Sequence, residues 1–232
     1  MMKDTATISW PADDFSRIPY AVYCDPGIYD KEQDLIFRGL TWNYLGLEAE
    51  IPNEGDFLTT KLGEMSVIVN RGEKNKIYAF FNRCMHRGML LCREKKGNVK
   101  NHTCPYHQWT YDLTGQLRGV PFPKGVNGCG GLPSDFDRKQ IQLRALKIEV
   151  YRGIIFGSCK EDVEPLKDYL GPAIIKELDR LFHKPIQILG YQRQRIRGNW
   201  KLYNDNVRDP NHGGLLHMFH ATFGLYRLSQ KG

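Results

Sequence analysis

The chain has 232 residues, 41% of them hydrophobic, which is enough for one large domain or two modest ones. The net charge is +7 with the basic residues scattered, so we expect no nucleic-acid binding; at most the charge favours an acidic protein partner. The polar start lacks the apolar core of a signal peptide, and no apolar run approaches the roughly 20 residues of a membrane span. We therefore expect a cytoplasmic protein that does not bind a membrane.

The first two thirds of the chain predict an arm followed by β-structure. Residues 1–40 are mixed, with a short helix expected over 31–40, and we interpret them as an arm. From 41 to 158, β-branched and aromatic runs alternate with turn-forming stretches, and the Gly- and Pro-rich stretch 119–134 predicts a loop. The two expected hairpins pair 66–69 with 77–81 and 146–150 with 154–156.

The character of the sequence changes after residue 158. Apolar residues recur at helical spacing from 164 to 182, and Pro172 is expected to kink or divide that helix. A second helix is expected to begin near 199–201. The whole pattern predicts an α+β fold, in which an antiparallel β domain over 41–158 precedes a second region over 159–232.

Four potential metal ligands lie on two short segments. Cys84 and His86 share one, and Cys104 and His107 share the other, so each segment offers one thiolate and one imidazole. A two-iron cluster with two sulfur ligands on one iron and two nitrogen ligands on the other, the Rieske [2Fe–2S] centre, is bound in this way. The alternative is a structural zinc site, although zinc knuckles usually pair Cys with Cys and His with His. We predict the iron–sulfur centre.

Other residues near these segments have simpler interpretations. Trp109 is expected to pack in the core beside the cluster. The remaining cysteines show no disulfide pattern and are expected to be free thiols: Cys24, Cys92, Cys129 and Cys159.

The two segments carry a resemblance to a known family. Cys-Met-His-Arg-Gly at 84–88 and Cys-Pro-Tyr-His-Gln-Trp at 104–109 resemble the Rieske motif of aromatic-ring-hydroxylating oxygenase large subunits. A second tract, Asp-Pro-Asn-His-Gly-Gly-Leu-Leu-His at 209–217, is similar to the Asp-x-x-His-x-x-x-x-His signature of the same oxygenases. The resemblance implies that His212 and His217 ligate a mononuclear Fe(II). It also implies that Asp209 hydrogen-bonds a ligand histidine and bridges to the Rieske histidine of a neighbouring subunit.

The spacing of the second tract can be considered on its own. Residues five apart on a helix differ by about 140° around the axis, so two ligands at this spacing need a break, which Gly213 and Gly214 supply. The alternative is an ordinary helix start, with Asp209 at the N-cap and a proline after it, and with histidines that merely pack. Taken without the upstream segments, this simpler interpretation is the stronger one; together with them, iron ligation by His212 and His217 is favoured.

The third ligand of a facial triad is a carboxylate, and no Asp or Glu follows Asp209 in this chain. In the family it comes from later in the chain. The resemblance therefore implies the N-terminal half of a large subunit, with a helix-grip catalytic domain that is incomplete and an iron site that lacks its carboxylate. We expect the isolated chain to bind a cluster without hydroxylating.

For the complete protein the resemblance implies electron flow from NAD(P)H through a reductase, with or without a ferredoxin, to the Rieske cluster and then to the mononuclear iron. That iron hydroxylates an aromatic substrate with O2. The tract 200–210 looks closest to the branch that acts on aromatic acids such as salicylate, anthranilate or terephthalate. A trimer of large subunits is implied, with or without a small β subunit. The alternative functions are a Rieske protein that only transfers electrons, beside an inactive remnant, and a zinc-stabilised structural module.

Overall fold

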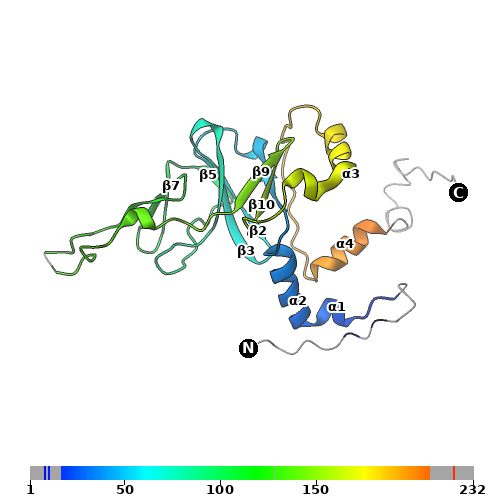
Figure 1. Cartoon of the computed structure of the whole chain (residues 1–232), viewed down its shortest axis with the longest axis horizontal. Helices are drawn as coiled ribbons and strands as arrows, with labels where there is room; N and C mark the ends of the chain where they lie inside the picture. The colour runs from blue at the N-terminus through cyan, green and yellow to red at the C-terminus, as the bar shows by residue number, and fades with distance from the viewer. Residues whose placement is uncertain (1–7, 9, 11–16, 128, 210–221, 223–232) are drawn as a thin grey trace. The chain divides into compact units, whose positions relative to one another are not determined.

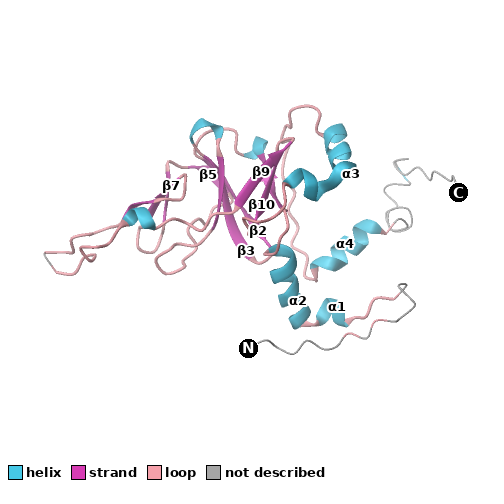
Figure 2. Cartoon of the chain, viewed as in Figure 1, coloured by secondary structure: helices cyan, strands magenta, loops and turns pink. Residues whose placement is uncertain are grey.

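A computed structural model describes residues 8, 10, 17–127, 129–209 and 222 (Figures 1 and 2). These residues belong to two compact units: residues 31–190, and the described parts of 1–30 and 191–232. None of the described helices combines the length and the apolar character that crossing a bilayer requires. The boundaries expected at residues 40 and 158 stay predictions.

The unit 31–190 is built on antiparallel sheets, which confirms the predicted fold class. Three sheets are described, with the strand orders β1-β10-β9, β4-β3-β2-β5 and β6-β7-β8. The strands are β1 (Asn43–Leu47), β2 (Asp56–Leu62), β3 (Met65–Arg71), β4 (Ile77–Phe81), β5 (Lys96–Asn98), β6 (Asn101–Thr103), β7 (Thr110–Asp112), β8 (Leu117–Gly119), β9 (Lys147–Tyr151) and β10 (Ile154–Ser158). Both expected hairpins are confirmed, as β3–β4 and β9–β10.

The strand β3 lies between two hydrophobic cores, because successive side chains of a strand point to opposite faces. Val67 and Val69 are fully buried in a core that includes Leu45 and Ile155 from the β1-β10-β9 sheet. Ile68, also fully buried, faces a second core. That second core underlies the predicted ligand segments, and its buried members include Phe57, Phe80, Cys84, Leu91, Cys104, Trp109, Tyr111, Leu117 and Leu143.

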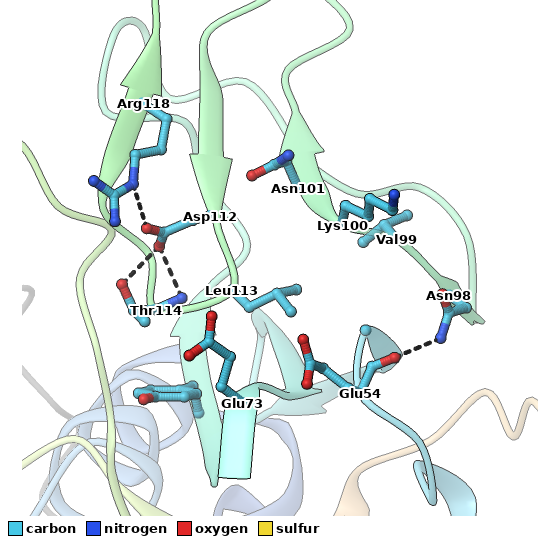
Figure 3. A pocket seen from close by; sticks show the side chains of 12 residues that line it. Glu54, Glu73, Asn98, Val99, Lys100, Asn101, Asp112, Leu113, Thr114 and Arg118 are labelled. Atoms are coloured by element: carbon cyan, nitrogen blue, oxygen red, sulfur yellow. Dashed lines mark hydrogen bonds and ion pairs between the residues drawn. The ribbon is translucent and has the colours of Figure 1, made fainter. Parts of the chain in front are cut away.

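The small β6-β7-β8 sheet is closed at one end by a turn built around Asp112 (Figure 3). The carboxylate of Asp112 accepts hydrogen bonds from the amide of Thr114 at 2.8 Å and the amide of Gln116 at 3.1 Å, and it also accepts one from the hydroxyl of Thr114 at 2.6 Å. Its other oxygen pairs with Nε of Arg118 at 2.5 Å. Partial burial acts to raise the pKa of Asp112, but these bonds together hold it below the usual value.

The helices are few. They are α1 (Ala21–Cys24), α2 (Pro26–Glu32), α3 (Leu166–Leu181) and α4 (Trp200–Arg208), with a π turn at Gln33–Phe37 and 3₁₀ turns at Glu48–Glu50, Glu73–Asn75 and Arg138–Gln140. The helix expected over 31–40 begins earlier, as α2, and passes directly into the π turn.

The two later helices were both predicted. The α3 helix is interrupted at Gly171, where φ is +69°, immediately before Pro172, which confirms the expected kink. Leu166, at its first turn, is buried with Trp42 and Val163. In the other unit, Asn199 caps α4 by accepting a hydrogen bond from the amide of Lys201 at 3.1 Å.

The Asp112 turn gives a prediction on pH. Because the folded-state pKa of Asp112 is lowered, its contribution to stability is present above the ordinary Asp value of about 3.9 and is lost as the pH falls through the folded pKa. We expect Asp112→Asn to lower the urea midpoint at pH 7 and to have less effect near pH 3. The matched control is Asp135→Asn, an exposed residue of the same unit; an equal loss in both variants at pH 7 would contradict the prediction.

Candidate metal centre

The first predicted ligand segment is a tight turn that follows β4. The amide of Cys84 donates a hydrogen bond to the carbonyl of Met89 at 2.8 Å, and the carbonyl of Cys84 accepts one from the amide of Gly88 at 2.9 Å. Gly88 has φ of +68°, in the left-handed region that only glycine adopts without cost. The turn is therefore closed by backbone bonds on both sides of its cysteine.

The second segment joins β6 to β7 and repeats the same bonds. The amide of Cys104 donates to the carbonyl of Trp109 at 2.8 Å, and the carbonyl of Cys104 accepts from the amide of Gln108 at 3.0 Å. Gln108 has φ of +55°. A side chain in this region costs about 1–2 kcal/mol, so the turn is held against some backbone strain. The two cysteines therefore occupy equivalent positions in two similar turns, and in each turn the residue four positions after the cysteine is in the left-handed region.

The two thiols are buried together at the base of the turns. Cys84 is 3% exposed and Cys104 is 1% exposed. Burial raises the pKa of Cys84, and the neighbouring Cys104 thiol raises it further, although hydrogen bonds from Tyr111 and from the backbone act the other way. Two adjacent buried thiols lose their protons together only when a cation compensates the charge, so this pair suits metal binding coupled to proton release.

Tyr111, on β7, connects the two segments. Its side chain is fully buried, and its hydroxyl oxygen accepts a hydrogen bond from the amide of Met85 at 3.0 Å. The same oxygen lies 3.3 Å from Sγ of Cys84. Because the oxygen already accepts the Met85 amide, its own proton is free to point at the sulfur. Burial raises the pKa of Tyr111, so the hydroxyl keeps that proton. The sequence carries no signal for this role, because a tyrosine in a strand is usually a packing residue.

The two imidazoles meet at the outer edge of the turns. Nδ1 of His86 lies 3.2 Å from Nδ1 of His107. Two nitrogens bound about 2.1 Å from one tetrahedral metal are about 3.4 Å apart, so this separation fits two ligands of a single ion. Its limited burial lowers the pKa of His86, and the charges of His107 and Arg87 act in the same direction. The ring is therefore favoured in the neutral form that binds metal.

Aromatic side chains fix the orientation of both imidazoles. The ring of His86 stacks on Trp109 with centroids 4.8 Å apart and planes 11° apart. The ring of Tyr106 lies against the ring of His107, with centroids 3.7 Å apart. Trp109 is 8% exposed and also contacts Phe136 edge-to-face, which agrees with the expected packing role. A cavity of about 560 Å³ opens beside these rings, so the histidine edge is the accessible side of the site.

The donor set fits a two-iron cluster. The structure brings the four predicted ligands into two pairs, a buried sulfur pair and an accessible nitrogen pair. Within the described residues no three Cys, His, Asp or Glu side chains converge on one point. In a Rieske centre, two cysteines hold one iron and two histidines hold the other, which is the arrangement that these two pairs offer. Cys92 is not part of the set; its Sγ lies 3.8 Å from the carbonyl of Glu94.

The second predicted site is mostly outside the described residues, because His212 and His217 are among those not described. So are Gly213 and Gly214, the expected break between them. Asp209 is described and lies directly after α4 as its C-cap, with its amide 3.4 Å from the carbonyl of Asn206. It therefore ends one helix, which was not foreseen.

A larger hollow, of about 630 Å³, lies at the Asp112 turn (Figure 3). Its lining includes acids, bases, amides and a few apolar residues, and the Asp112 carboxylate in it is already paired with Arg118. The four cluster ligands are not among its lining residues, and the lining offers no thiol or imidazole. The chemistry of the chain is therefore expected at the two turns and not at this hollow.

Comparison with known proteins agrees with this geometry. Residues 41–132 match the Rieske [2Fe–2S] domain family. The chain is 50% identical over 228 residues to the large subunit of anthranilate 1,2-dioxygenase from Burkholderia cepacia, covering 98% of this chain and 54% of that protein. It is 48% identical over 225 residues to subunit alpha 2 of the terminal oxygenase component of terephthalate 1,2-dioxygenase from Comamonas sp. This match covers 97% of this chain and 54% of that protein.

The chain is thus similar to the large subunits of ring-hydroxylating dioxygenases over about half of their length, and residues 41–132 match the Rieske domain. Among solved structures, naphthalene 1,2-dioxygenase from Rhodococcus sp. bound to indole superposes with a TM-score of 0.79 at 37% identity, over 90% of this chain and 48% of that one. The chain spans about half the length of the curated relatives it matches. Its Rieske region includes both ligand turns, so the sequence motif and the fold point to the same centre.

The four-ligand set gives a prediction on composition. We expect Cys104→Ala to lose acid-labile sulfide and the visible absorbance of the cluster, because the iron held by the two cysteines would keep only one thiolate ligand. Cys92→Ala is the matched control, since its thiol lies in the same loop as Cys84 and contacts the Glu94 carbonyl instead. Loss of sulfide in the Cys92 variant, with sulfide kept in the Cys104 variant, would show that the ligand set is wrong.

The Tyr111 hydroxyl gives a prediction on redox potential. A hydrogen bond to a ligand sulfur stabilises the reduced, more negative state, so its removal lowers the potential. A change of about 1.4 kcal/mol corresponds to about 59 mV for one electron, and we expect a fall on the order of 50 mV in Tyr111→Phe. Tyr106→Phe, whose hydroxyl has no recorded bond to a sulfur, is the control. Protein-film voltammetry measures both; equal potentials in the two variants would refute the assigned bond.

Proposed function

We propose that this chain works as the large subunit of a ring-hydroxylating oxygenase, with a [2Fe–2S] cluster on Cys84, His86, Cys104 and His107. The strongest support is the arrangement of the four side chains in two pairs. The thiols of Cys84 and Cys104 are buried, and the imidazoles of His86 and His107 lie at the edge with their Nδ1 atoms 3.2 Å apart. When bound, such a cluster supplies one-electron chemistry at roughly −150 to +300 mV, above an all-cysteine cluster.

The cysteines, the histidines and their aromatic neighbours would have different roles in electron transfer. The Cys84 and Cys104 sulfurs lie in the core, where water is excluded. The imidazoles of His86 and His107 lie at the accessible edge, where a partner can approach closely. Coordination through Nδ1 would leave Nε2 of each ring free to hydrogen-bond to that partner. Trp109 and Tyr106 would hold the ring planes during the exchange.

For the second half of the reaction we propose that His212 and His217 contribute to a mononuclear Fe(II) site that activates O2. Asp209 would accept a hydrogen bond from a ligand histidine and relay the electron from the cluster of an adjacent subunit. The support is the signature spacing of these three residues together with the family. Residues 210–232 contain no Asp or Glu that could be the carboxylate ligand of this iron.

The substrate class that we propose is an aromatic carboxylic acid. The relatives with 47–50% identity are named for anthranilate, terephthalate and salicylate, which share a carboxylate on a benzene ring. The relatives named for biphenyl are only 35–36% identical. Electrons would come from NAD(P)H through a reductase, with or without a ferredoxin, and the subunits would assemble as a trimer.

A segment exchange tests the oxygenase role. In the anthranilate 1,2-dioxygenase large subunit, the 228 matched residues are replaced by this chain, and the hybrid is given that system's reductase, NADH, anthranilate and ¹⁸O2. We expect ¹⁸O-labelled product, and no product above background from the same hybrid with Cys104→Ala.

The cluster is scored independently of product by acid-labile sulfide and by its electron paramagnetic resonance signal. A hybrid that takes up one electron per cluster from dithionite yet forms no labelled product would contradict the oxygenase role and favour a protein that only transfers electrons. Product from the Cys104→Ala hybrid would contradict the assignment of the relay.

A further inference from the structure

The side chains of the helix α4 are largely exposed. None of its nine residues is buried, and Leu202, Tyr203 and Val207 are 50%, 59% and 65% exposed. A helix of this length is marginal in water by itself, since isolated helices shorter than about 12–15 residues rarely persist. Its place therefore depends on contacts with other segments of its unit. Because Asp209 is the C-cap of α4, those contacts also decide where Asp209 lies.

Tyr23, in α1, contacts α4 at three points. Its hydroxyl donates a hydrogen bond to Oδ2 of Asp205 at 2.6 Å, although the two residues are 182 positions apart in the sequence. Its backbone carbonyl accepts a hydrogen bond at 3.0 Å from Nδ2 of Asn199, the N-cap of α4. Nζ of Lys201 lies 6.0 Å from the centroid of its ring. One residue thus holds α4 both at its first residues and near its middle.

Two of these contacts lie on the face of α4 that leads to Asp209. Residues four apart on a helix are neighbours on one face, and Lys201, Asp205 and Asp209 follow one another at that spacing. The bond at Asn199 fixes where the helix begins, and the bond at Asp205 opposes rotation about the helix axis. A rotation by one residue is about 100°, which would turn Asp209 to another side of the helix.

The chemistry of the Tyr23 hydroxyl suits a lasting contact. The hydrogen bond to Asp205 is the main cause that raises the pKa of Tyr23, so the hydroxyl keeps its proton and stays a donor at neutral pH. Its acceptor is a carboxylate, and hydrogen bonds to ionised groups are shorter and stronger than those between neutral groups. The bond is exposed, however, so its strength is moderated by water.

We propose that Tyr23 is a positioning residue for Asp209, because its hydrogen bonds to Asn199 and Asp205 set the place and the rotation of the helix that ends there. The proposal rests on the proposed function, which assigns the electron relay to Asp209. Tyr23 acts only through α4 and takes no part in the chemistry. A displacement of about 1 Å at a reacting group can cost about 100-fold in rate, so a remote residue that fixes the helix can matter for turnover.

The first test uses the 232-residue chain itself and measures amide hydrogen exchange over residues 200–208. The variant is Tyr23→Phe, which keeps the ring and the carbonyl and loses only the hydroxyl. The control is Tyr20→Phe, in the turn before α1, whose side chain is 86% exposed. We expect exchange in α4 to be about three- to tenfold faster in the Tyr23 variant and unchanged in the control.

A double-mutant cycle checks that the effect belongs to this bond. We expect Asp205→Ala to raise exchange as much as Tyr23→Phe, and the double variant to add nothing further, because both changes remove the same interaction. Exchange in α4 that is equal in the parent chain and in Tyr23→Phe would overturn the proposal. So would additive effects in the double variant.

The second test uses the anthranilate dioxygenase hybrid described above. We expect Tyr23→Phe to lower kcat per cluster at least about fivefold, with sulfide content, midpoint potential and the KM for anthranilate unchanged. Asp205→Asn keeps an acceptor oxygen for the hydroxyl and should recover most of the rate that Asp205→Ala loses. Equal kcat in Tyr23→Phe and Tyr20→Phe would overturn the positioning role. A parallel fall in kcat, cluster content and substrate affinity would also overturn it, since it would show a merely structural role.

The two measurements separate this proposal from the oxygenase role. Hydrogen exchange involves no turnover, so it scores the contact between Tyr23 and α4 even when the hybrid forms no product. A hybrid without product contradicts the proposed function, and the exchange result alone then supports or overturns the hold of Tyr23 on α4. An active hybrid in which Tyr23→Phe changes exchange but not kcat overturns the positioning role and leaves the oxygenase role intact.

Discussion

One side chain holds the two ligand turns to each other. Tyr111 extends from β7, the strand that follows the second turn. Its hydroxyl accepts a hydrogen bond from the Met85 amide and lies beside the Cys84 sulfur, both in the first turn. The remaining geometry depends on this connection, because the turns come from different sheets and share no strand. If the turns shifted relative to each other, the histidine nitrogens would no longer be spaced for one metal ion. The fully buried ring of Tyr111 also joins the site to the core.

The site has an inside and an outside, and its chemistry follows from that asymmetry. The sulfurs of Cys84 and Cys104 lie in the core, protected from water and oxidants, and burial strengthens each hydrogen bond to them. The imidazoles of His86 and His107 lie at the edge, where another protein can approach them without disturbing the core. The four-stranded sheet makes this possible, because β3 faces one core with Val67 and Val69 and supports the metal turns with Ile68 on its opposite face. The scaffold is thus stabilised largely by a core that the metal site does not use.

The sequence alone indicated the four candidate ligands and predicted much of the fold, for physical reasons. The mixed Cys–His spacing restricts the chemistry strongly, and alternation and turn residues predict the β3–β4 and β9–β10 hairpins. The contact of Tyr111 with Cys84 could not be predicted, because it joins residues 27 apart through the packing of two sheets. Gln108 in the left-handed region carried no signal either, since glutamine is not a residue that marks such turns.

The two turns differ in how much chain they have to spare. Six residues separate β6 from β7, whereas fourteen separate β4 from β5. In the short connection, Pro105 and the strained Gln108 leave little backbone freedom, so an insertion there would displace a ligand directly. The longer connection can absorb added or exchanged residues beyond Met89, because the cost of closing a loop rises only slowly with its length. The connection between β4 and β5 can therefore change in evolution to suit a new redox partner, while the shorter connection between β6 and β7 keeps its length and holds its ligands in place.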